Sequence, residues 1–177
     1  MVDQLDMQHF DSVFDRYKNL VYKTACLMLS DPSEAEDVLQ DVFIRVYRLG
    51  GSYDPEKGSL ATWIRRVTVN QCISKQKSGK HSYSLDEMRQ NGHQPDEDEI
   101  DFDDKLALKL SIEKMLQSLS GKYRAALILR YVDDLTYEEI AETLDIPLGT
   151  VKSRINAAIT TLRKSRKREV ENELRTS

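Results

Sequence analysis

Apolar side chains recur three and four residues apart along the first part of the chain, which is the spacing of one buried face of an α-helix. The first stripe consists of Phe10, Val13, Phe14, Tyr17, Leu20, Val21 and Met28. The second stripe consists of Ala35, Val38, Leu39, Val42, Val46 and Leu49. The pattern therefore predicts two amphipathic helices, and the second is expected to end at Gly50-Gly51.

Residues that favour helix ends divide this part of the chain further. Asp31 is the expected N-cap of the second helix, with Pro32 at its first position and Glu34 placed to complete a capping box. The segment 52–58 contains an Asp-Pro pair and is predicted to be a loop. A third helix is expected over residues 59–77.

The apolar pattern stops between residues 78 and 104. This segment contains two glycines, one proline and the nearly all-acidic run PDEDEIDFDD, so it has too few apolar side chains to order its backbone. We expect a flexible acidic linker over 78–104, between one domain at 1–77 and another at 105–177.

Four more helices are predicted after the linker. One carries leucines at 106, 110, 116 and 119, a break follows at Ser120-Gly121, the next helix spans 123–132, and two short helices come last. No stretch alternates apolar and polar residues as a strand does. The predicted fold class is all-α, with two small helical domains.

The last two helices have the pattern of a helix-turn-helix. Thr136 and Glu139 can form a capping box that starts a short helix ending at Leu144, and residues 145–147 form the turn. The buried stripe of the next helix is expected to be Val151, Ile155, Ala158 and Leu162. Two helices of a simple bundle are the alternative.

The opposite face of this last helix is polar and contains no acid. In a helix-turn-helix the second helix lies in the major groove, where Lys donates to guanine, Asn pairs with adenine and Ser does either. The basic segment 163–168 would then lie over phosphates. The face consists of Lys152, Ser153, Asn156 and Thr160.

The composition is that of a globular protein, with 177 residues, 40% of them apolar and 32% charged. Cys26 and Cys72 are too few for a disulfide scaffold and lack the spacing of a zinc site. The N-terminus lacks the pattern of a signal peptide, and no stretch approaches the ~18 apolar residues of a membrane span. We expect a soluble, cytoplasmic protein without membrane insertion.

The formal net charge of −4, taken alone, argues against a nucleic-acid partner. Its distribution argues for one, because two windows contain basic residues and no Asp or Glu. The window 57–85 contains six lysines and arginines, and the window 146–168 contains seven. Two solvated basic faces are the alternative, but basic windows in an otherwise acidic chain are typical of phosphate contact.

The second helix has an outer face of mixed chemistry. A single exposed isoleucine is common on protein surfaces, but one that is flanked by two acids and a glutamine also fits a protein contact. The face consists of Asp37, Gln40, Asp41, Ile44 and Arg48.

The segment YDPEKGSLATWIRRVTVN combines aromatic, basic and small polar residues. Such a mixture suits single-stranded nucleic acid, because bases stack on rings while cations follow the backbone. Trp63 has the helical spacing of a core residue, so Tyr53 and Asn70 are the stronger candidates to meet a base.

Three segments resemble the signature segments of bacterial sigma factors of the extracytoplasmic-function (ECF) type, in the sigma-70 superfamily. They are SEAEDVLQDVFIRVYR, GSLATWIRRVTVN and YRAALILRYVDDLTYEEIAETLDIPLGTVKSRI. The resemblance covers nearly the whole chain in order. It implies a region 2 domain at 1–77 and a region 4 domain at 105–177. It also implies a subunit that binds core RNA polymerase and directs promoter-specific initiation.

The resemblance assigns a role to each surface. The outer face of the second helix, Arg48 included, would bind the clamp helices of the polymerase β′ subunit, and the helix 123–131 would face the β flap. The linker would run towards the RNA exit channel, and an anti-sigma factor is a further expected partner. Minus-10 recognition and melting would fall to Tyr53, Lys57, Ser59, Trp63, Arg65, Arg66, Asn70 and Lys75. Minus-35 recognition would fall to Thr150, Lys152, Ser153, Arg154, Asn156, Ala157 and Arg163.

Two positions depart from the family pattern. Many members continue the recognition helix with arginines, whereas this chain has Ala157, so its preferred minus-35 sequence is expected to differ. Ser74 stands where many members carry Asp, which alters the local salt-bridge pattern.

Two other classes of function are weaker interpretations. A conventional helix-turn-helix regulator, which binds duplex DNA without polymerase, leaves the Ile44 face and the aromatic loop unexplained. An enzyme is weaker still, because His9, His81 and His93 have no nucleophile, phosphate loop or metal spacing around them. We expect no catalytic residue, no cofactor and no metal site.

Overall fold

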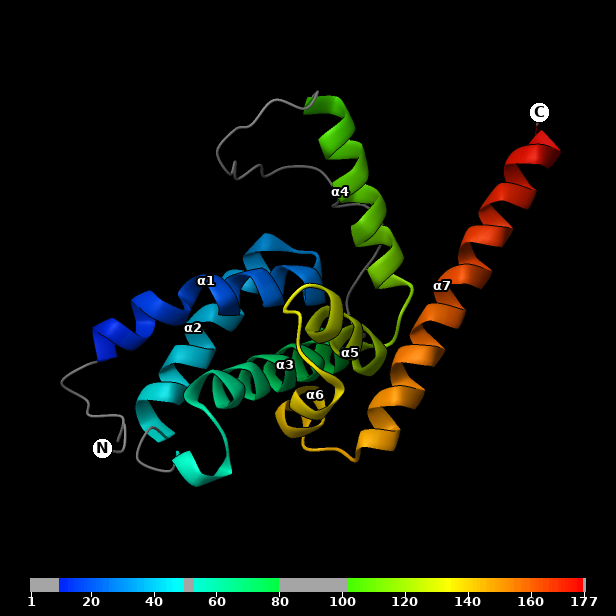
Figure 1. Cartoon of the computed structure of the whole chain (residues 1–177). Coiled ribbons are helices and arrows are strands. Elements are labelled where there is room, and N and C mark those ends of the chain that lie inside the picture. The colour runs from blue at the N-terminus through cyan, green and yellow to red at the C-terminus, as the bar shows by residue number, and fades with distance from the viewer. Residues whose placement is uncertain (1–9, 50–52, 80–101, 177) are drawn as a thin grey trace.

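The computed structural model describes residues 10–49, 53–79 and 102–176, which fold into helices with short connections (Figure 1). No strand occurs within these ranges, and the predicted all-α fold class is confirmed. Most of the predicted linker, residues 80–101, lies outside the described residues. The helices are α1 (Phe10–Leu29), α2 (Pro32–Leu49), the 3-10 helix η3 (Pro55–Lys57), α3 (Leu60–Gly79), α4 (Phe102–Gln117), α5 (Gly121–Tyr131), α6 (Tyr137–Leu144) and α7 (Leu148–Thr176).

Side-chain caps start α2 and α6 where the sequence predicts them. Asp31 Oδ1 accepts a hydrogen bond of 3.0 Å from the N–H of Glu34, which confirms the N-cap of α2. Thr136 Oγ1 accepts from the N–H of Glu139 at 3.2 Å, and Glu139 Oε2 accepts from the N–H of Thr136 at 2.7 Å. This reciprocal pair confirms the capping box. Asp145, with a φ of 54°, then ends α6 in the left-handed conformation.

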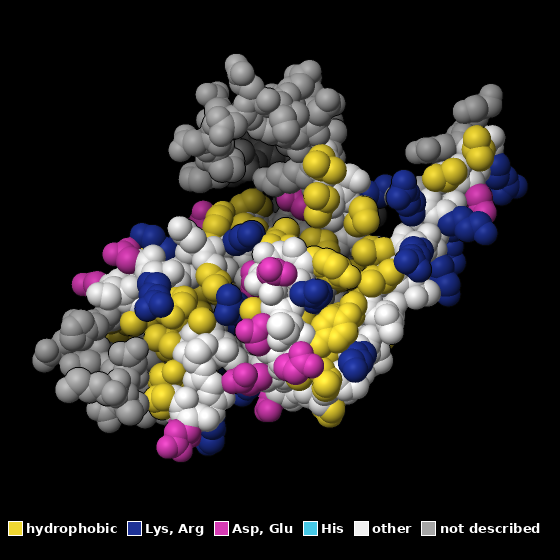
Figure 2. Space-filling model, in the orientation of Figure 1, with side chains coloured by type: hydrophobic (Ala, Val, Ile, Leu, Met, Phe, Trp, Pro, Cys, Tyr) yellow, Lys and Arg dark blue, Asp and Glu magenta, His cyan; other side chains and the backbone are white. Residues whose placement is uncertain are grey.

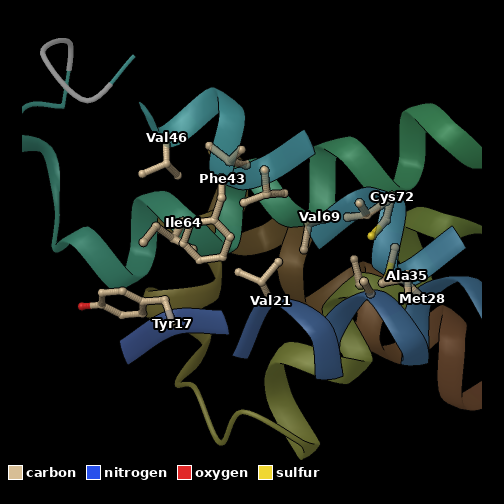
Figure 3. Close-up of a cluster of buried hydrophobic side chains, with 14 of the residues drawn as sticks. Tyr17, Val21, Met28, Ala35, Phe43, Val46, Ile64, Val69 and Cys72 are labelled. Carbon is tan, nitrogen blue, oxygen red and sulfur yellow. The ribbon is translucent and has the colours of Figure 1, made fainter. Parts of the chain in front are cut away.

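Helices α1, α2 and α3 pack around one apolar core (Figure 3). Val21, Val46 and Ile64 are fully buried there, because each lies on the face that its helix turns towards the other two. The predicted stripes of α1 and α2 thus form the first core, with one error near the end of α2.

Phe43 is buried and Leu49 is exposed, which is the reverse of what the predicted stripe implies. Leu49 belongs to the predicted stripe but is 44% exposed, whereas Phe43 lies outside the stripe and is only 4% exposed. Phe43 is buried because α1 crosses that side of α2, where the rings of Phe10 and Phe14 meet it edge-on at centroid distances of 6.2 and 4.7 Å. Leu49 ends α2 beyond these rings.

Helix α5 takes part in two cores. Ala125 and Ile128, each 1% exposed, belong to the core of α1, α2 and α3. Ala126 and Leu129 belong to a second core between α5, α6 and α7. Neighbouring residues of a helix point about 100° apart, so one helix can serve both. Helix α5 therefore joins the first helical group (α1–α3) to the second (α4–α7).

Helix α7 is much longer than the short helix predicted at its position. It has 29 residues, and its C-terminal part extends past the other helices (Figure 1). No Gly or Pro follows Gly149, so the sequence contains no residue that would end the helix early. Lys167 and Glu171, one turn apart, approach to 3.9 Å and add support to its C-terminal part. Val151 and Ile155 lie in the second core as predicted. None of the described helices combines the length and the apolar character needed to cross a membrane.

Candidate nucleic-acid interface

The outer face of α2 carries the residues that were expected to contact a protein. Ile44 is 48% exposed, and Tyr47, one turn later, is 55% exposed and extends its apolar surface. Tyr47 is absent from the prediction, although its i+3 spacing from Ile44 indicates the same side of the helix. All five predicted residues are exposed: Asp37, Gln40, Asp41, Ile44 and Arg48.

Helix α3 holds two acids of this face. Lys75 Nζ lies 2.8 Å from Asp37 Oδ2, and Gln71 Nε2 donates to Asp41 Oδ2 at 3.0 Å. Burial lowers the pKa of Lys75, but its hydrogen bond to Asp37 and the nearby negative charges outweigh that effect, so the net shift of the pKa is upward. Lys75, predicted to contact DNA, is therefore engaged in an ion pair with α2.

A small pocket of about 160 Å³ lies between η3 and the first turns of α3. Five of the predicted minus-10 residues line it: Tyr53, Lys57, Ser59, Trp63 and Arg66. The rings of Tyr53 and Trp63 are tilted by 47°, with centroids 5.9 Å apart, and Tyr53 Oη donates to the carbonyl of Gly58 at 3.1 Å. Trp63 is half-buried and packs against the first core as well, so it serves both environments.

Short capping contacts shape the walls of this pocket. Asp54 Oδ1 accepts from the N–H of Glu56 at 3.1 Å, and Ser59 Oγ accepts from the N–H of Thr62 at 3.2 Å at the start of α3. Gly58 has a φ of +134°, a backbone conformation in which a residue with a side chain would be strained. Asp54 and Thr62 line the pocket but were not predicted. The Asp-Pro pair and the Ser-x-x-Thr spacing are signals that could have identified them.

Arg65 and Arg66 turn towards the second helical group. Arg65 Nε donates to Asp133 Oδ2 at 3.1 Å, and these side chains are only 17% and 9% exposed. Arg66 also lines the pocket and donates to the backbone carbonyls of Glu142 and Thr143. The structure thus brings the pocket residues together with Arg66 and places Arg65 in an ion pair. Of the predicted minus-10 residues, Asn70 lies exposed further along α3.

The outer face of α7 carries the predicted minus-35 residues, and Lys and Arg side chains follow along the helix (Figure 2). Ser153 Oγ donates to the carbonyl of Thr150 at 2.9 Å, so the outward lone pairs of this hydroxyl remain available to accept. The exposed members are Lys152, Ser153, Asn156 and Arg163, and the half-buried members are Thr150, Arg154 and Ala157.

These three surfaces do not form one site. In Figure 1, α2 and α7 lie on opposite sides of α3 and α6, with the pocket at the η3 end of α3. The α2 face, the pocket and the outer face of α7 are therefore separate surfaces, and each can contact a different part of an assembly.

The described residues contain no group of three or more His, Cys, Asp or Glu that could hold a metal ion. All three histidines lie outside the described residues. Cys26 and Cys72 form no disulfide, and burial raises the pKa of Cys72 to about 12, so its thiol is protonated at neutral pH.

Two protein families match separate parts of the chain. The family described as Sigma-70 region 2 matches residues 13–81, and the family described as Sigma-70, region 4 matches residues 109–162. The ECF RNA polymerase sigma factor SigW of Bacillus subtilis is 33% identical over 172 residues, which cover 90% of this chain and 89% of SigW. SigK of Mycobacterium sp. (strain KMS) is 30% identical over 161 residues, which cover 89% of this chain and 83% of SigK.

Two solved structures have a similar fold. The sigma factor RpoE of Bartonella quintana, solved in complex with the anti-sigma factor NepR, matches with a TM-score of 0.66 at 23% identity, over 90% of this chain and 98% of that one. CnrH, solved in complex with the cytosolic domain of CnrY, matches with a TM-score of 0.65 at 18% identity, over 92% of this chain and 90% of that one.

Proposed function

The chain belongs to the ECF group of RNA polymerase sigma factors, which are transcription initiation factors, and we propose that it reads the minus-10 and minus-35 promoter elements with two domains. The proposed region 2 domain is 1–77, the region 4 domain is 105–177, and the segment 78–104 links them. The separation of surfaces carries the proposal: a protein-contact face, a pocket of about 160 Å³ and an acid-free helix face lie on different helices. Tethering makes the second promoter contact effectively intramolecular.

The outer face of α2 binds the clamp helices of the polymerase β′ subunit in this proposal. An exposed Ile44 beside Tyr47 supplies apolar area at the centre, and the acids around it supply specificity. The hydrogen bond from Gln71 to Asp41 and the ion pair of Lys75 with Asp37 hold both carboxylates in place before the partner arrives.

The β flap docks on α5 in this proposal, at an apolar groove where α4, α5 and α7 meet (Figure 2). The groove has a volume of about 200 Å³. Its walls include Met115, which is 42% exposed, and Tyr131, which is 61% exposed. Exposed apolar side chains gathered in a concave surface favour a protein partner.

The pocket beside η3 captures a base that is flipped out of the melted minus-10 element. The rings of Tyr53 and Trp63 offer stacking surfaces, Ser59 and Thr62 offer hydroxyls to the base edge, and Lys57 attracts a phosphate. Extruding a base costs a few kcal/mol of stacking, which these contacts and the polymerase must offset.

Helix α7 reads the minus-35 element in the major groove. Lys152 donates to guanine, and Asn156 can pair with adenine through two hydrogen bonds. Because the hydroxyl hydrogen of Ser153 is bonded to the carbonyl of Thr150, Ser153 acts as an acceptor, which suits the amino groups of adenine and cytosine. Ala157 offers no hydrogen bond and instead presents a methyl group that fits thymine.

Regulation and location follow from the family in this proposal. RpoE, which shares the fold, was solved with an anti-sigma factor, and we propose that an anti-sigma factor also restrains this chain. The protein acts in the cytoplasm with RNA polymerase and has no catalytic chemistry of its own.

Transcription with purified core RNA polymerase tests this function. We expect the chain to direct initiation from defined start sites on promoter DNA that core polymerase alone does not use. A conventional helix-turn-helix regulator would instead bind a specific duplex tightly without polymerase and leave initiation by core polymerase unchanged. That result would exclude the proposal.

A further inference from the structure

The C-terminal segment of α7, residues 163–176, extends past the other helices, and we refer to it as the α7 tip (Figure 1). The region 4 family match ends at residue 162, directly before it. At a rise of about 1.5 Å per residue, the tip projects by about 20 Å. Its described side chains are exposed apart from the half-buried Ser165. The tip is therefore a helix surface that a partner can reach.

Two apolar side chains lie on the α7 tip, and Figure 2 shows apolar surface near this end of the helix. Val170 is 47% exposed, and Leu174, four residues later, is 75% exposed. Leu162 lies on the same four-residue row and lines the apolar groove between α4, α5 and α7. Rows of this spacing form the ridges with which helices pack against each other. The row thus has a recessed apolar end at the groove and an exposed apolar end at the tip.

Charge divides the α7 tip into two halves. Residues 163–168 contain five lysines and arginines and no acid, whereas residues 169–173 contain three glutamates and no base. An antiparallel copy of the same segment would place each basic half beside an acidic half. A parallel copy would place like charges together, which is unfavourable. The charge pattern therefore fits a second copy of this chain in the antiparallel orientation.

A two-fold axis at Arg168 also matches the apolar positions. It pairs residue 162 of one copy with residue 174 of the other, and residue 166 with residue 170. Leu174 would then meet Leu162 and the groove wall at Met115, which is 42% exposed. The two Arg168 side chains would approach each other at the axis, where Glu171, one turn away, offers a counter-charge. One register thus satisfies both the charges and the apolar row.

We propose that two copies of the chain pair through antiparallel α7 tips, each placing Leu174 in the groove of the other. The same surface is used on both copies, so the contact closes as a dimer and does not continue as a filament. The groove is also the proposed docking site of the β flap. One consequence therefore rests on the proposed function: the dimer and the polymerase complex exclude each other, and dilution favours the chain that can bind polymerase.

Sedimentation velocity of the full chain, without polymerase or DNA, tests the dimer. Between about 1 μM and about 1 mM protein, the mass should rise from that of one chain towards that of two. The association should weaken as salt is raised, because the paired charges are exposed. A chain that stays monomeric over this range, or whose association does not respond to salt, would overturn the proposal.

Variants at both ends of the apolar row test the register. Leu174→Glu and Met115→Glu each place a charge in the apolar contact and should raise the dimer dissociation constant by about tenfold or more. The control is Leu110→Glu, since Leu110 is 54% exposed and lies on the side of α4 opposite Ile112 of the groove. It should dimerise normally, and circular dichroism should show the same helical content for all three. Equal effects of Leu174→Glu and Leu110→Glu would overturn the proposal.

Spin labels test the orientation. Arg168→Cys and Arg175→Cys are made in separate proteins, each with Cys26 replaced by Ser and with Cys72 left buried. Antiparallel dimers should give a short distance between the two labels at 168 and one longer by about 20 Å at 175, which lies seven residues from the axis. Short distances at both positions would indicate parallel pairing and overturn the proposal.

Other uses of the α7 tip are separate outcomes. Tip variants that change only the affinity for core polymerase or for promoter DNA, and leave the mass of the chain unchanged, would assign the tip to that partner and overturn the dimer. Failure of the proposed function appears elsewhere, as a lack of promoter-dependent initiation by the wild-type chain, because the dimer assay contains neither polymerase nor DNA.

Discussion

Arg65 of α3 and Asp133, which follows α5, lie 68 positions apart in the chain and form an ion pair of 3.1 Å. Exposed ion pairs contribute little to stability, because water and salt screen them. This pair is 17% and 9% exposed, so screening is weaker and loss of either partner leaves a partly desolvated charge. It therefore couples the two helical groups.

A double-mutant cycle measures that coupling. We expect Arg65→Ala and Asp133→Ala to show a coupling free energy of at least about 1 kcal/mol in urea unfolding, above the ~0.2–1 kcal/mol of exposed pairs. The control cycle uses Lys18 and Asp15, which pair at 2.7 Å with side chains 40% and 70% exposed. Equal coupling energies in the two cycles would show that the Arg65 pair is an ordinary surface contact.

Contacts between residues close in the chain could be predicted from the sequence, whereas contacts between distant helices could not. The capping box at Thr136 depends on residues three positions apart, so local spacing reveals it. The partners of Arg65 and Arg66 depend on how α5 and α6 pack against α3, which no local pattern encodes. The burial of Phe43 likewise depends on the crossing of α1 over α2.

The candidate site follows the same division. The exposed faces of α2 and α7 were predictable because helical periodicity separates an outer face from a buried stripe. The pocket walls at Asp54 and Thr62 arise from the turn geometry of η3, and the ion pair of Lys75 with Asp37 arises from packing between helices. Sequence spacing could name the residues of these surfaces but not their partners.

The capping box makes stability depend on pH. The backbone hydrogen bond with Thr136 lowers the pKa of Glu139 below its ordinary value of 4.5. A depressed pKa adds stability above the ordinary value, and that stability is lost as the pH falls through the folded value. Glu139→Gln should therefore lower the unfolding free energy at pH 7, and its difference from the wild type should shrink below pH 4.5, as urea titrations at several pH values can measure. Glu138→Gln, on an exposed side chain of the same turn, removes a carboxylate but leaves the capping box intact and is the control.

Asp41, one of the acids beside Ile44 on the α2 face, should be essential for polymerase binding. Asp41→Arg replaces the acceptor of Gln71 with a cation, and we expect the affinity for core RNA polymerase to fall by more than about tenfold, because close charge pairs at interfaces carry large coupling energies. Circular dichroism should show unchanged helical content, since Asp41 is exposed. Glu36→Arg makes the same charge change outside this face and should bind normally. Similar affinities for both variants would place the contact elsewhere.

The aromatic wall of the pocket should act after polymerase has bound. Tyr53→Ala removes the ring beside Trp63, and we expect open-complex stability to fall by about 1–3 kcal/mol, the range measured for stacking of a base on a ring. Tyr53→Phe keeps the ring and loses only the hydrogen bond to the carbonyl of Gly58, so its effect should be smaller. Permanganate footprinting of the melted region measures both. An alanine variant that melts DNA as well as the wild type would remove this pocket from promoter opening.

The face of α7 should show two kinds of DNA contact. Asn156→Ala should cost about 1–3 kcal/mol and relax preference at one base of the minus-35 element. Arg163→Ala should weaken binding to all sequences alike and reduce the salt dependence by about one counterion. Holoenzyme binding to a set of single-base promoter variants at several salt concentrations distinguishes them. Identical profiles for the two variants would contradict base readout by Asn156.

Sequencing the 5′ ends of transcripts made in vitro from the genomic DNA of the source organism, with purified core RNA polymerase and this protein, tests the sigma-factor assignment most directly. The assignment predicts start sites that are absent with core polymerase alone and that lie downstream of two shared sequence motifs at a fixed spacing. The Asp41→Arg variant should not produce these start sites. Start sites that are scattered as with core polymerase alone, or that share a single motif, would contradict recognition of a promoter by two domains.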